Sequence, residues 1–419
     1  MRENYRHLYA DTFWFGVLGG SAMAFIAIFA ARLGASSFQI SLLTAGPGVI
    51  NLLFSLPAGR WLEGRPLVRT SFCSAVLYRL GYLAFVPLPW LLGEQHQVWA
   101  IVWITLLASI PGTLLAISFN ALFADVVPAE MRGEVVGKRN ALMAISLTGT
   151  TLICGALLDR IAFPTNYQIV FGLGAFGAAL STYHLGRLYL PGLETPRRNG
   201  QPIGDLARPG LMRFLDTLRH PAGLRFLTRS GGKPLLRLDL LRGPFGPFMA
   251  AYLIFYACQY VPLPLFPLAF VHQMKLTDGQ ISLGSALFYL TMMLVSLRLG
   301  YASVRFGHRR MLVFGAIFYS LYPLILGLAR DASLYWVASL IGGGVWAVTS
   351  ASLVNRLMER VPEDERPAYM ALHNLALNLG ILLGSLAGPA LSEGIGLRQA
   401  ILLGAGLRLL AGILLGIWG

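Results

Sequence analysis

Charged side chains are scarce in this sequence: Asp, Glu, Lys and Arg make up only 12% of the 419 residues, whereas 56% are hydrophobic. A soluble protein of this length needs about twice that share of charge to cover its surface. The composition therefore excludes an ordinary soluble enzyme, and equally a disordered or fibrous chain. It favours a protein that is embedded in a lipid bilayer.

Cysteine and catalytic motifs are also lacking. The three cysteines, Cys73, Cys154 and Cys258, lie in separate apolar runs without a CxxC motif or a Cys/His cluster. We therefore predict no metal site and no cofactor. The sequence contains no phosphate-binding loop, no GxSxG and no HExxH motif. We accordingly predict that the protein is not an enzyme and does not drive itself with ATP.

Long apolar runs, in contrast, are abundant. A helix needs about 20 mostly apolar residues to cross a bilayer. Twelve runs meet this condition, at about 12–33, 38–59, 68–92, 98–123, 139–159, 166–189, 245–270, 279–302, 310–329, 332–355, 369–392 and 399–418. The sequence therefore predicts an all-α polytopic membrane protein with twelve transmembrane helices.

The basic residues sort to one side of the predicted membrane. If the N-terminus lies in the cytoplasm, the short loops on that side hold 12 Lys and Arg residues, Lys138 and Arg139 among them. The short outer loops hold five, Arg32 among them. This bias predicts a multi-pass protein of the plasma membrane with both termini cytoplasmic. The net charge of +14 then reflects topology, so we expect the lipid bilayer as a partner and no nucleic acid.

The two halves of the chain resemble each other. Gln39-Ile40-Ser41 recurs as Gln280-Ile281-Ser282, and Asp125 and Arg132 recur as Glu359 and Arg366. The repeat predicts two six-helix bundles in the same orientation, at residues 1–190 and 244–419. The basic segment 191–243 is the predicted linker, with a short amphipathic helix near Leu211–Leu218. Both a lipid-bound linker and a solvated tether remain open.

The loop after the second run of each half resembles the signature G-x-x-x-D-R-x-G-R-R of the major facilitator superfamily (MFS). The second-half copy runs from Gly300 to Arg310, with Val304 in place of the acid. The first-half copy runs from Gly59 to Pro66 and keeps the acid as Glu63. The resemblance implies two bundles that bind a small-molecule substrate between them and expose it alternately to either side. We expect a monomer.

The same resemblance implies a cytoplasmic gate. In the outward-facing state we expect Arg305 to pair with Glu359, and Arg65 or Arg69 to pair with Asp125. The alternative is that these arginines only set the topology. The full set of gate candidates is Gly59, Glu63, Arg65, Arg69, Asp125, Arg132, Gly300, Arg305, Gly307, Arg309, Arg310, Glu359 and Arg366.

Helical spacing selects one face of each run that the resemblance places around the cavity. The candidate substrate-binding residues are Ser21, Phe25, Ser109, Thr113, Tyr252, Tyr256, Gln259, Trp346, Ser350, Asn374 and Asn378. This lining is aromatic and amide-rich without a fixed charge, which suits a neutral or amphipathic organic molecule. For each Ser and Thr the alternative is a hydrogen bond to its own helix backbone.

Titratable groups in the membrane are few. Asp11 falls at the entrance of the first run, so the sequence shows no clear carboxylate that carries a proton. His373 is the one titratable residue on an inner helix, and is either a carrier or a core histidine. Arg79 and Arg408 fall in mid-membrane and either bind an anionic group of the substrate or are structural. Whether a proton or sodium is the coupling ion stays open.

The predicted function is secondary active transport of a small organic solute, with efflux of amphipathic compounds as the first choice. Uptake of a sugar or another metabolite remains open. The alternative is a transporter-like membrane sensor or lipid scramblase without coupled solute flux.

Overall fold

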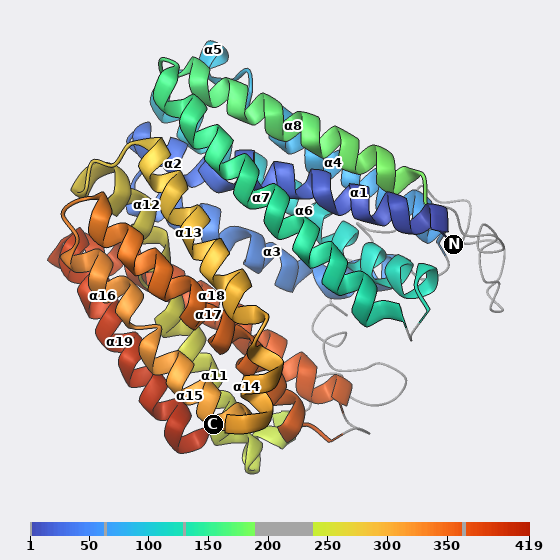
Figure 1. Ribbon diagram of the computed structural model, residues 1–419, viewed down its shortest axis with the longest axis vertical. Helices are drawn as coiled ribbons and strands as arrows, with labels where there is room; N and C mark the ends of the chain where they lie inside the picture. The colour runs from blue at the N-terminus through green and yellow to red at the C-terminus, as the bar shows by residue number, and fades with distance from the viewer. Residues whose placement is uncertain (1, 63–64, 129–130, 189–237, 363–365) are drawn as a thin grey trace, which may run out of the picture.

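The computed structural model describes residues 2–62, 65–128, 131–188, 238–362 and 366–419. Every regular element in these described residues is helical (Figure 1), which confirms the all-α prediction. The expected amphipathic helix near 211–218 and most of the expected linker lie outside the described residues.

The first half forms six helical segments that match the first six predicted runs. The first segment is α1 (Arg2–Leu18), a π-helical turn η1 (Gly19–Met23) and α2 (Ala24–Arg32). The others are α3 (Ser37–Leu62), α4 (Leu67–Leu83) with the short α5 (Leu88–Leu91), α6 (Glu94–Val126), α7 (Arg132–Arg160) and α8 (Thr165–Gly186).

The second half begins with η4 (Leu238–Arg242) and again gives six segments. Three of them are broken: α11 (Phe245–Tyr260) with η5 (Leu263–Leu265), α12 (Phe266–Leu268) and η6 (Ala269–Gln273); α13 (Asp278–Ser296) with α14 (Leu299–Phe306); and α15 (His308–Phe318) with α16 (Leu321–Leu328). The unbroken ones are α17 (Ala332–Arg360), α18 (Arg366–Ile395) and α19 (Leu397–Trp418). Pro262, Pro264 and Pro267 interrupt the segment that starts with α11, because proline has no amide hydrogen to donate.

Eleven of the described helical segments are long and apolar enough to cross a membrane. The remaining predicted run, 68–92, is α4 with 17 residues followed by α5. A helix of 17 residues lies at the lower limit for crossing a bilayer. Each of the twelve predicted runs therefore coincides with a helical segment.

The recurring Gln-Ile-Ser triplet marks the same helix start in both halves. Gln39 and Ser36 exchange side-chain-to-backbone hydrogen bonds of 2.8 and 3.2 Å at the start of α3. Gln280 and Thr277 form the same reciprocal pair, at 3.0 and 3.2 Å, at the start of α13. Such a capping box satisfies two backbone donors that the first turn leaves free. The repeat in the sequence thus has a structural cause.

The helices pack as two lobes, a first lobe of α1–α8 and a second lobe of α11–α19 (Figure 1). The lobes meet mainly where α7 packs on α13 and where α3 packs on α18. In Figure 1 they are close together around α2 and α12 and diverge toward the side that carries both chain ends. The apolar core is uneven in the same way. Among the described residues one buried cluster crosses between the lobes, and it contains Phe29 and Phe171 of the first lobe and Phe270 of the second.

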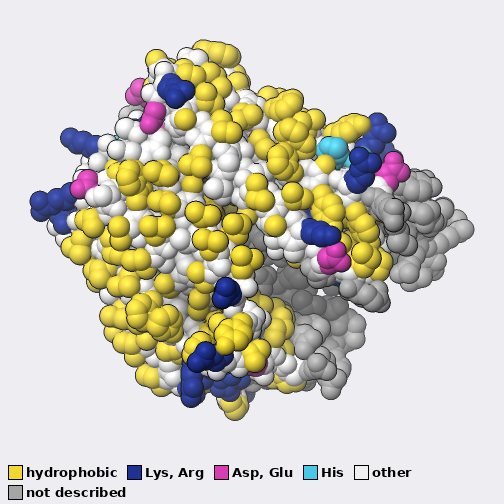
Figure 2. Space-filling model, viewed as in Figure 1, with side chains coloured by type: hydrophobic (Ala, Val, Ile, Leu, Met, Phe, Trp, Pro, Cys, Tyr) yellow, Lys and Arg dark blue, Asp and Glu magenta, His cyan; other side chains and the backbone are white. Residues whose placement is uncertain are grey.

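The surface fits a bilayer. Hydrophobic side chains cover both lobes in Figure 2, while most of the visible Lys, Arg, Asp and Glu side chains lie toward the ends of the helices. Large side chains such as Leu77, Leu107 and Ile153 are about three-fifths exposed on this apolar belt. In water such a surface would drive aggregation, whereas in lipid it is the expected one.

A stripe of glycines lets α11 and α18 approach closely, as a run of small residues does in membrane helices. A Cβ atom on Gly380 would lie 2.6 Å from Cβ of Tyr256, and one on Gly384 would overlap the carbonyl oxygen of Ala257. The close contact therefore depends on the missing side chains.

Replacing Gly384 by alanine should force α11 and α18 apart and lower the thermal stability. Overpacking of this kind costs about 1–3 kcal/mol. The measurement is the unfolding temperature of the purified protein in detergent. Gly406→Ala is the matched control, because a Cβ on Gly406 in α19 meets no atom within 4 Å. Equal unfolding temperatures for both variants would contradict the close packing.

Candidate functional site

A pocket of about 350 Å³ lies inside the first lobe. Six helices contribute to it, α1, α3, α4, α6, α7 and α8. The residues that line it are Asp11, Phe15, Pro47, Asn51, Tyr78, Arg79, Ser109, Gly112, Thr113, Leu115, Ala116, Phe119, Arg139 and Leu185. Its volume is at the lower end of the range for small-molecule sites. Its lining is mostly apolar but includes three charged side chains, which the sequence analysis did not expect.

Asp11 is the acid of this pocket. Its side chain is only 5% exposed, because α1 begins at Arg2 and places Asp11 more than two turns inside the helix. The expectation of a position at the helix entrance was therefore wrong. Ser181 of α8 donates a hydrogen bond of 2.6 Å to Asp11 Oδ1. The guanidinium of Arg79 lies 3.5 Å from the same oxygen.

Arg79 reaches the pocket from α4 and is 6% exposed. Its Nη1 donates to Thr182 Oγ1 at 2.7 Å, and its Nε has no hydrogen-bond partner among the described residues. The sequence left two roles open for this arginine, anion binding and structure. The ion pair with Asp11 gives Arg79 a structural role. Its position on the pocket wall and its unpartnered Nε also allow it to bind an anion.

Arg139 is the third charged group. The sequence analysis counted it among cytoplasmic loop charges, but α7 begins at Arg132 and carries Arg139 two turns into the helix. Its Nε donates to Thr12 Oγ1 at 2.7 Å. Its guanidinium lies over the rings of Phe119 and Phe123, 4.8 and 5.2 Å from their centroids. A guanidinium that stacks on aromatic faces is held in place without neutralisation of its charge.

The pocket includes two of the predicted substrate-binding residues of the first half and excludes the other two. Ser109 and Thr113 line it, with their hydroxyls bonded to the backbone oxygens of Thr105 and Ser109 at 2.7 and 3.0 Å. Ser21 is fully buried and donates to the Val17 oxygen at 2.6 Å. Phe25 is 1% exposed within the apolar cluster that crosses between the lobes.

Two of the predicted residues of the second half, Tyr252 and Tyr256, contact His373. Tyr256 Oη lies 2.9 Å from His373 Nε2, and the Tyr252 ring packs against the same imidazole while its hydroxyl donates to the Leu353 oxygen at 3.0 Å. Asn378 donates to the Asn374 oxygen at 2.8 Å and faces Gly48 of α3 across the lobe interface. His373 is thus held by two tyrosines.

Two further second-half candidates, Gln259 and Trp346, are connected to Arg408. This arginine is 1% exposed, donates to the backbone oxygen of Gln259 at 2.6 Å and lies 4.7 Å from the centroid of the Tyr319 ring. Trp346 packs against Tyr319 at 5.1 Å. Gln259 Oε1 has no hydrogen-bond partner among the described residues, and Ser350 donates weakly to its own helix at 3.4 Å.

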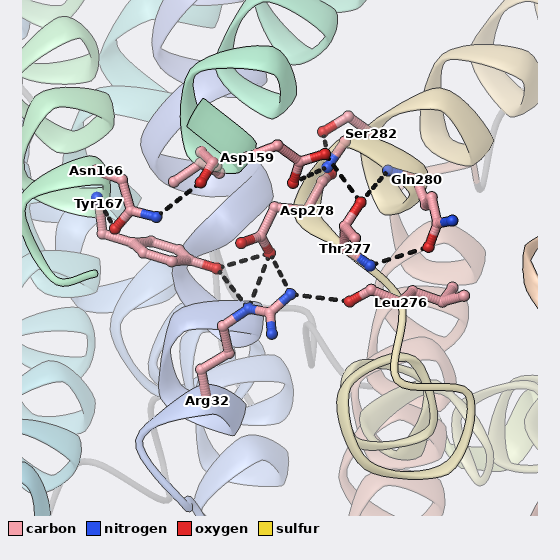
Figure 3. Close-up of polar contacts among 11 residues, drawn as sticks. Arg32, Asp159, Asn166, Tyr167, Leu276, Thr277, Asp278, Gln280 and Ser282 are labelled. Carbon is pink, nitrogen blue, oxygen red and sulfur yellow. Dashed lines mark hydrogen bonds and ion pairs between the residues drawn. The ribbon is translucent and has the colours of Figure 1, made fainter. Parts of the chain in front are cut away.

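The lobes are joined by a latch of charged side chains (Figure 3). It lies where α2 ends, on the side that is remote from both chain ends in Figure 1. Arg32, at the end of α2, donates from Nε and Nη2 to Asp278 Oδ1, at 3.0 and 2.8 Å. Tyr167 of α8 donates to the same oxygen at 2.8 Å. Arg32 also donates to the Leu276 oxygen at 3.0 Å. Three donors from the first lobe thus converge on one carboxylate of the second.

Asp159 extends this latch from α7. Its Oδ2 accepts from the Thr277 hydroxyl at 2.9 Å and its Oδ1 accepts from the Gly279 amide at 3.0 Å (Figure 3). A further tie joins the Ser41 hydroxyl of α3 to the backbone oxygen of Ser385 in α18. The sequence analysis treated Arg32 as a loop charge and missed the latch. The sequence held one indication of the latch. In the repeated capping box, Asp278 stands where the first half has Ser37.

Three gate candidates of the second half make contacts within their own lobe. Glu359 pairs with Arg356 at 2.9 Å, Arg305 lies 3.5 Å from the Tyr301 hydroxyl, and Arg309 donates to the Gly416 oxygen at 2.9 Å. Gly307 has φ of 77° between α14 and α15, so its turn favours glycine. The pairs expected in the outward-facing state stay a prediction.

The remaining gate candidates make few described contacts. The Arg65 guanidinium lies over the Trp61 ring at 3.9 Å, and Arg132 donates to the Val127 oxygen at 3.1 Å. Arg69, Asp125 and Arg310 are exposed, and a Cβ on Gly300 would meet no atom within 4 Å. Glu63 and the side-chain surroundings of Gly59 and Arg366 lie outside the described part of the chain.

Comparisons with known proteins agree on one family. The model of the Major Facilitator Superfamily matches residues 12–245 and 248–419. Multidrug resistance proteins 2 and 1 of Bacillus subtilis (strain 168) are each 24% identical, over 36% of this chain and 37% and 39% of their own lengths. The chain thus spans less than two-fifths of these curated relatives.

Solved structures resemble the whole chain. A bacterial homologue of the iron transporter ferroportin, in an inward-facing state, gives a TM-score of 0.74 at 14% identity, with 100% of this chain and 99% of that chain covered. A mutant of the nucleoside transporter NupG gives 0.70 at 12% identity, with 99% of both chains covered. At these identities the likeness shows the fold alone.

Breaking the Asp11–Arg79 pair should destabilise the first lobe more than removing both charges. Asp11→Leu or Arg79→Met alone leaves a buried charge without its partner, at a cost of about 3–5 kcal/mol. The double variant should lose clearly less than the sum of the two. The measurement is thermal unfolding of the four proteins in one detergent, with Asp125→Leu as an exposed control. Strictly additive losses would mean that the two side chains do not interact.

Proposed function

Because the chain belongs to the Major Facilitator Superfamily, we propose that it moves a small organic solute across the membrane as a secondary active transporter with alternating access. The family makes it a membrane transporter rather than an enzyme. The finer points, the mechanism, the solute and the coupling ion, are proposals that rest on the geometry of the two lobes.

The observation that carries the mechanism is the uneven contact between the lobes. The polar ties from Arg32, Asp159 and Ser41 lie at the end remote from the chain termini. At the opposite end the lobes diverge (Figure 1), and among the described residues Glu359 pairs within its own lobe. We take the open side as cytoplasmic from the charge bias of the loops. The conformation is then inward-facing, like that of the ferroportin homologue.

The solute is a small amphipathic compound, and export is the favoured direction. The pocket in the first lobe supports the chemical class, because it combines Phe15, Tyr78 and Phe119 with a few polar groups. The names of the two Bacillus relatives, multidrug resistance proteins, support export.

A proton is the favoured coupling ion. Asp11 is the only carboxylate among the described residues that line the pocket, and Arg79 and Ser181 hold it in a nearly dry position. A buried carboxylate that alternates between charged and neutral forms changes the interactions of both arginines. Sodium is the alternative, and would require a coordination shell of several oxygen atoms.

The decisive test is flux into proteoliposomes under an imposed pH or sodium gradient, with amphipathic dyes and nucleosides as probes. We expect pH-driven flux of at least one amphipathic probe, with loss of the pH dependence in Asp11→Asn. Flux driven only by sodium would overturn the choice of ion. Lipid mixing between leaflets without solute flux under any gradient would favour the scramblase alternative and overturn transport.

Removing the charge of Asp278 should release the outer latch. In Asp278→Asn the Arg32 guanidinium loses its counterion, which weakens the closed outer side by about 2 kcal/mol. Spin labels at Gln95→Cys and Glu393→Cys, on the outer ends of α6 and α18 in a cysteine-free background, should report a larger population at long distance.

Asp331→Asn is the matched control for this experiment, because Asp331 is exposed on the same side and caps α17 within its own lobe. An unchanged distance distribution in Asp278→Asn, with Asp331→Asn also unchanged, would show that the latch does not hold the outer side closed.

A further inference from the structure

The pocket of the first lobe holds more positive than negative charge. Two guanidinium groups, Arg79 and Arg139, face one carboxylate, Asp11, and the other described lining residues are uncharged. Membrane interiors disfavour an unbalanced charge strongly, and such groups usually pair with a partner of opposite sign. The imbalance therefore indicates a site for a negative charge that the described chain does not itself supply.

The hydrogen bonds show where that charge would be received. Asp11 already lies 3.5 Å from Arg79, whereas Arg139 makes one hydrogen bond, from Nε to the uncharged Thr12 hydroxyl. The Nη groups of Arg139 have no hydrogen-bond partner among the described residues. Arg79, with 94% of its surface buried, also keeps an unpartnered Nε. Both arginines therefore line one pocket and keep hydrogen-bond donors that the described residues do not use.

The rest of the wall fixes the kind of molecule. Phe15, Leu115 and Phe119 give the pocket an apolar surface beside the two arginines. Phe119 also lies under the Arg139 guanidinium, which holds the charged group at the edge of the apolar surface. A volume of about 350 Å³ admits a small amphiphile rather than a bulky drug.

We propose that this pocket binds the negatively charged head of a small organic acid, with a carboxylate on Arg139 and Arg79 and an apolar body against Phe15 and Phe119. One excess positive charge matches one negative charge, so a singly charged carboxylate fits better than a doubly charged phosphate. The inference rests on the proposed transport function and names the class of solute, amphipathic organic acids instead of neutral or cationic compounds.

Asp11 then competes with the solute for the arginines. When Asp11 is ionised, Arg79 is held on its carboxylate, and only Arg139 is free. When Asp11 is neutral, both guanidinium groups face the incoming carboxylate. Neutralising Asp11 should thus strengthen binding of an acid, which is the opposite of what loss of a substrate contact would do.

The test uses the full-length purified protein in lipid nanodiscs and three matched sets of probes. Benzoate, naphthalene-1-acetate and dodecanoate are each compared with the corresponding primary amide and primary amine, by calorimetric titration. We expect at least one carboxylate to bind on the order of tenfold more tightly than its amide and amine. Tighter binding of the amines, or no binding of any carboxylate at millimolar concentration, would overturn the proposal.

Variants separate the site from its surroundings. Arg139→Gln should weaken the carboxylate on the order of tenfold and leave its amide unchanged, and Arg139→Lys should recover part of the loss. Asp11→Asn should strengthen the carboxylate severalfold. Arg160→Gln, an exposed arginine at the other end of α7, is the control and should bind like the wild type. Equal carboxylate binding in Arg139→Gln and the wild type would rule out this site.

The outcome is independent of the flux experiment. A protein that binds carboxylates through Arg139 but moves no solute fails as a transporter and keeps the site. A protein that moves amphipathic probes but shows no preference for carboxylates keeps the function and loses the site.

Discussion

The lipid environment makes an unpaired charge costly, and this constraint accounts for how the buried arginines of the molecule are placed. Arg32 and Arg79 both lie in or beside hydrocarbon, and both meet a carboxylate: Asp278 in the second lobe and Asp11 in the first. Arg408 has no such partner among the described residues and relies on the Gln259 carbonyl and the Tyr319 ring. Whether a pair lies within a lobe or between lobes decides what it does, since only the second kind must break when the lobes move.

The sequence predicted the helices well because the signal for them is local. An apolar run of about 20 residues suffices for a membrane helix, and all twelve predicted runs coincide with helical segments. The repeat was also readable, because the caps at Ser36–Gln39 and Thr277–Gln280 use the same residues at the same spacing. The topology that the loop charges predict, with both termini cytoplasmic, stays a prediction.

The site was harder to predict because it depends on where a helix begins and which face it turns inward. Asp11 seemed peripheral only because the apolar run starts at residue 12, whereas the helix starts at Arg2. Arg139 was assigned to a loop on the same reasoning. Ser21 was placed on the cavity face by periodicity, but it packs against Gly174 of α8. Periodicity shows which residues share one face of a helix. Only contacts with neighbouring helices decide whether that face points toward the cavity.

The first membrane segment joins the two charged centres. Asp11 lies in α1 and Arg32 at the end of α2, and the backbone between them is helical throughout, with the π-helical turn Gly19–Met23 in the middle. Because π-helical turns loosen the regular hydrogen-bond pattern, they are common where helices bend at functional sites. Asp11 of the pocket therefore lies before this turn in the chain, and Arg32 of the latch lies after it. A change in the charge of Asp11 and the opening of the latch therefore act on the two ends of one continuous helical segment.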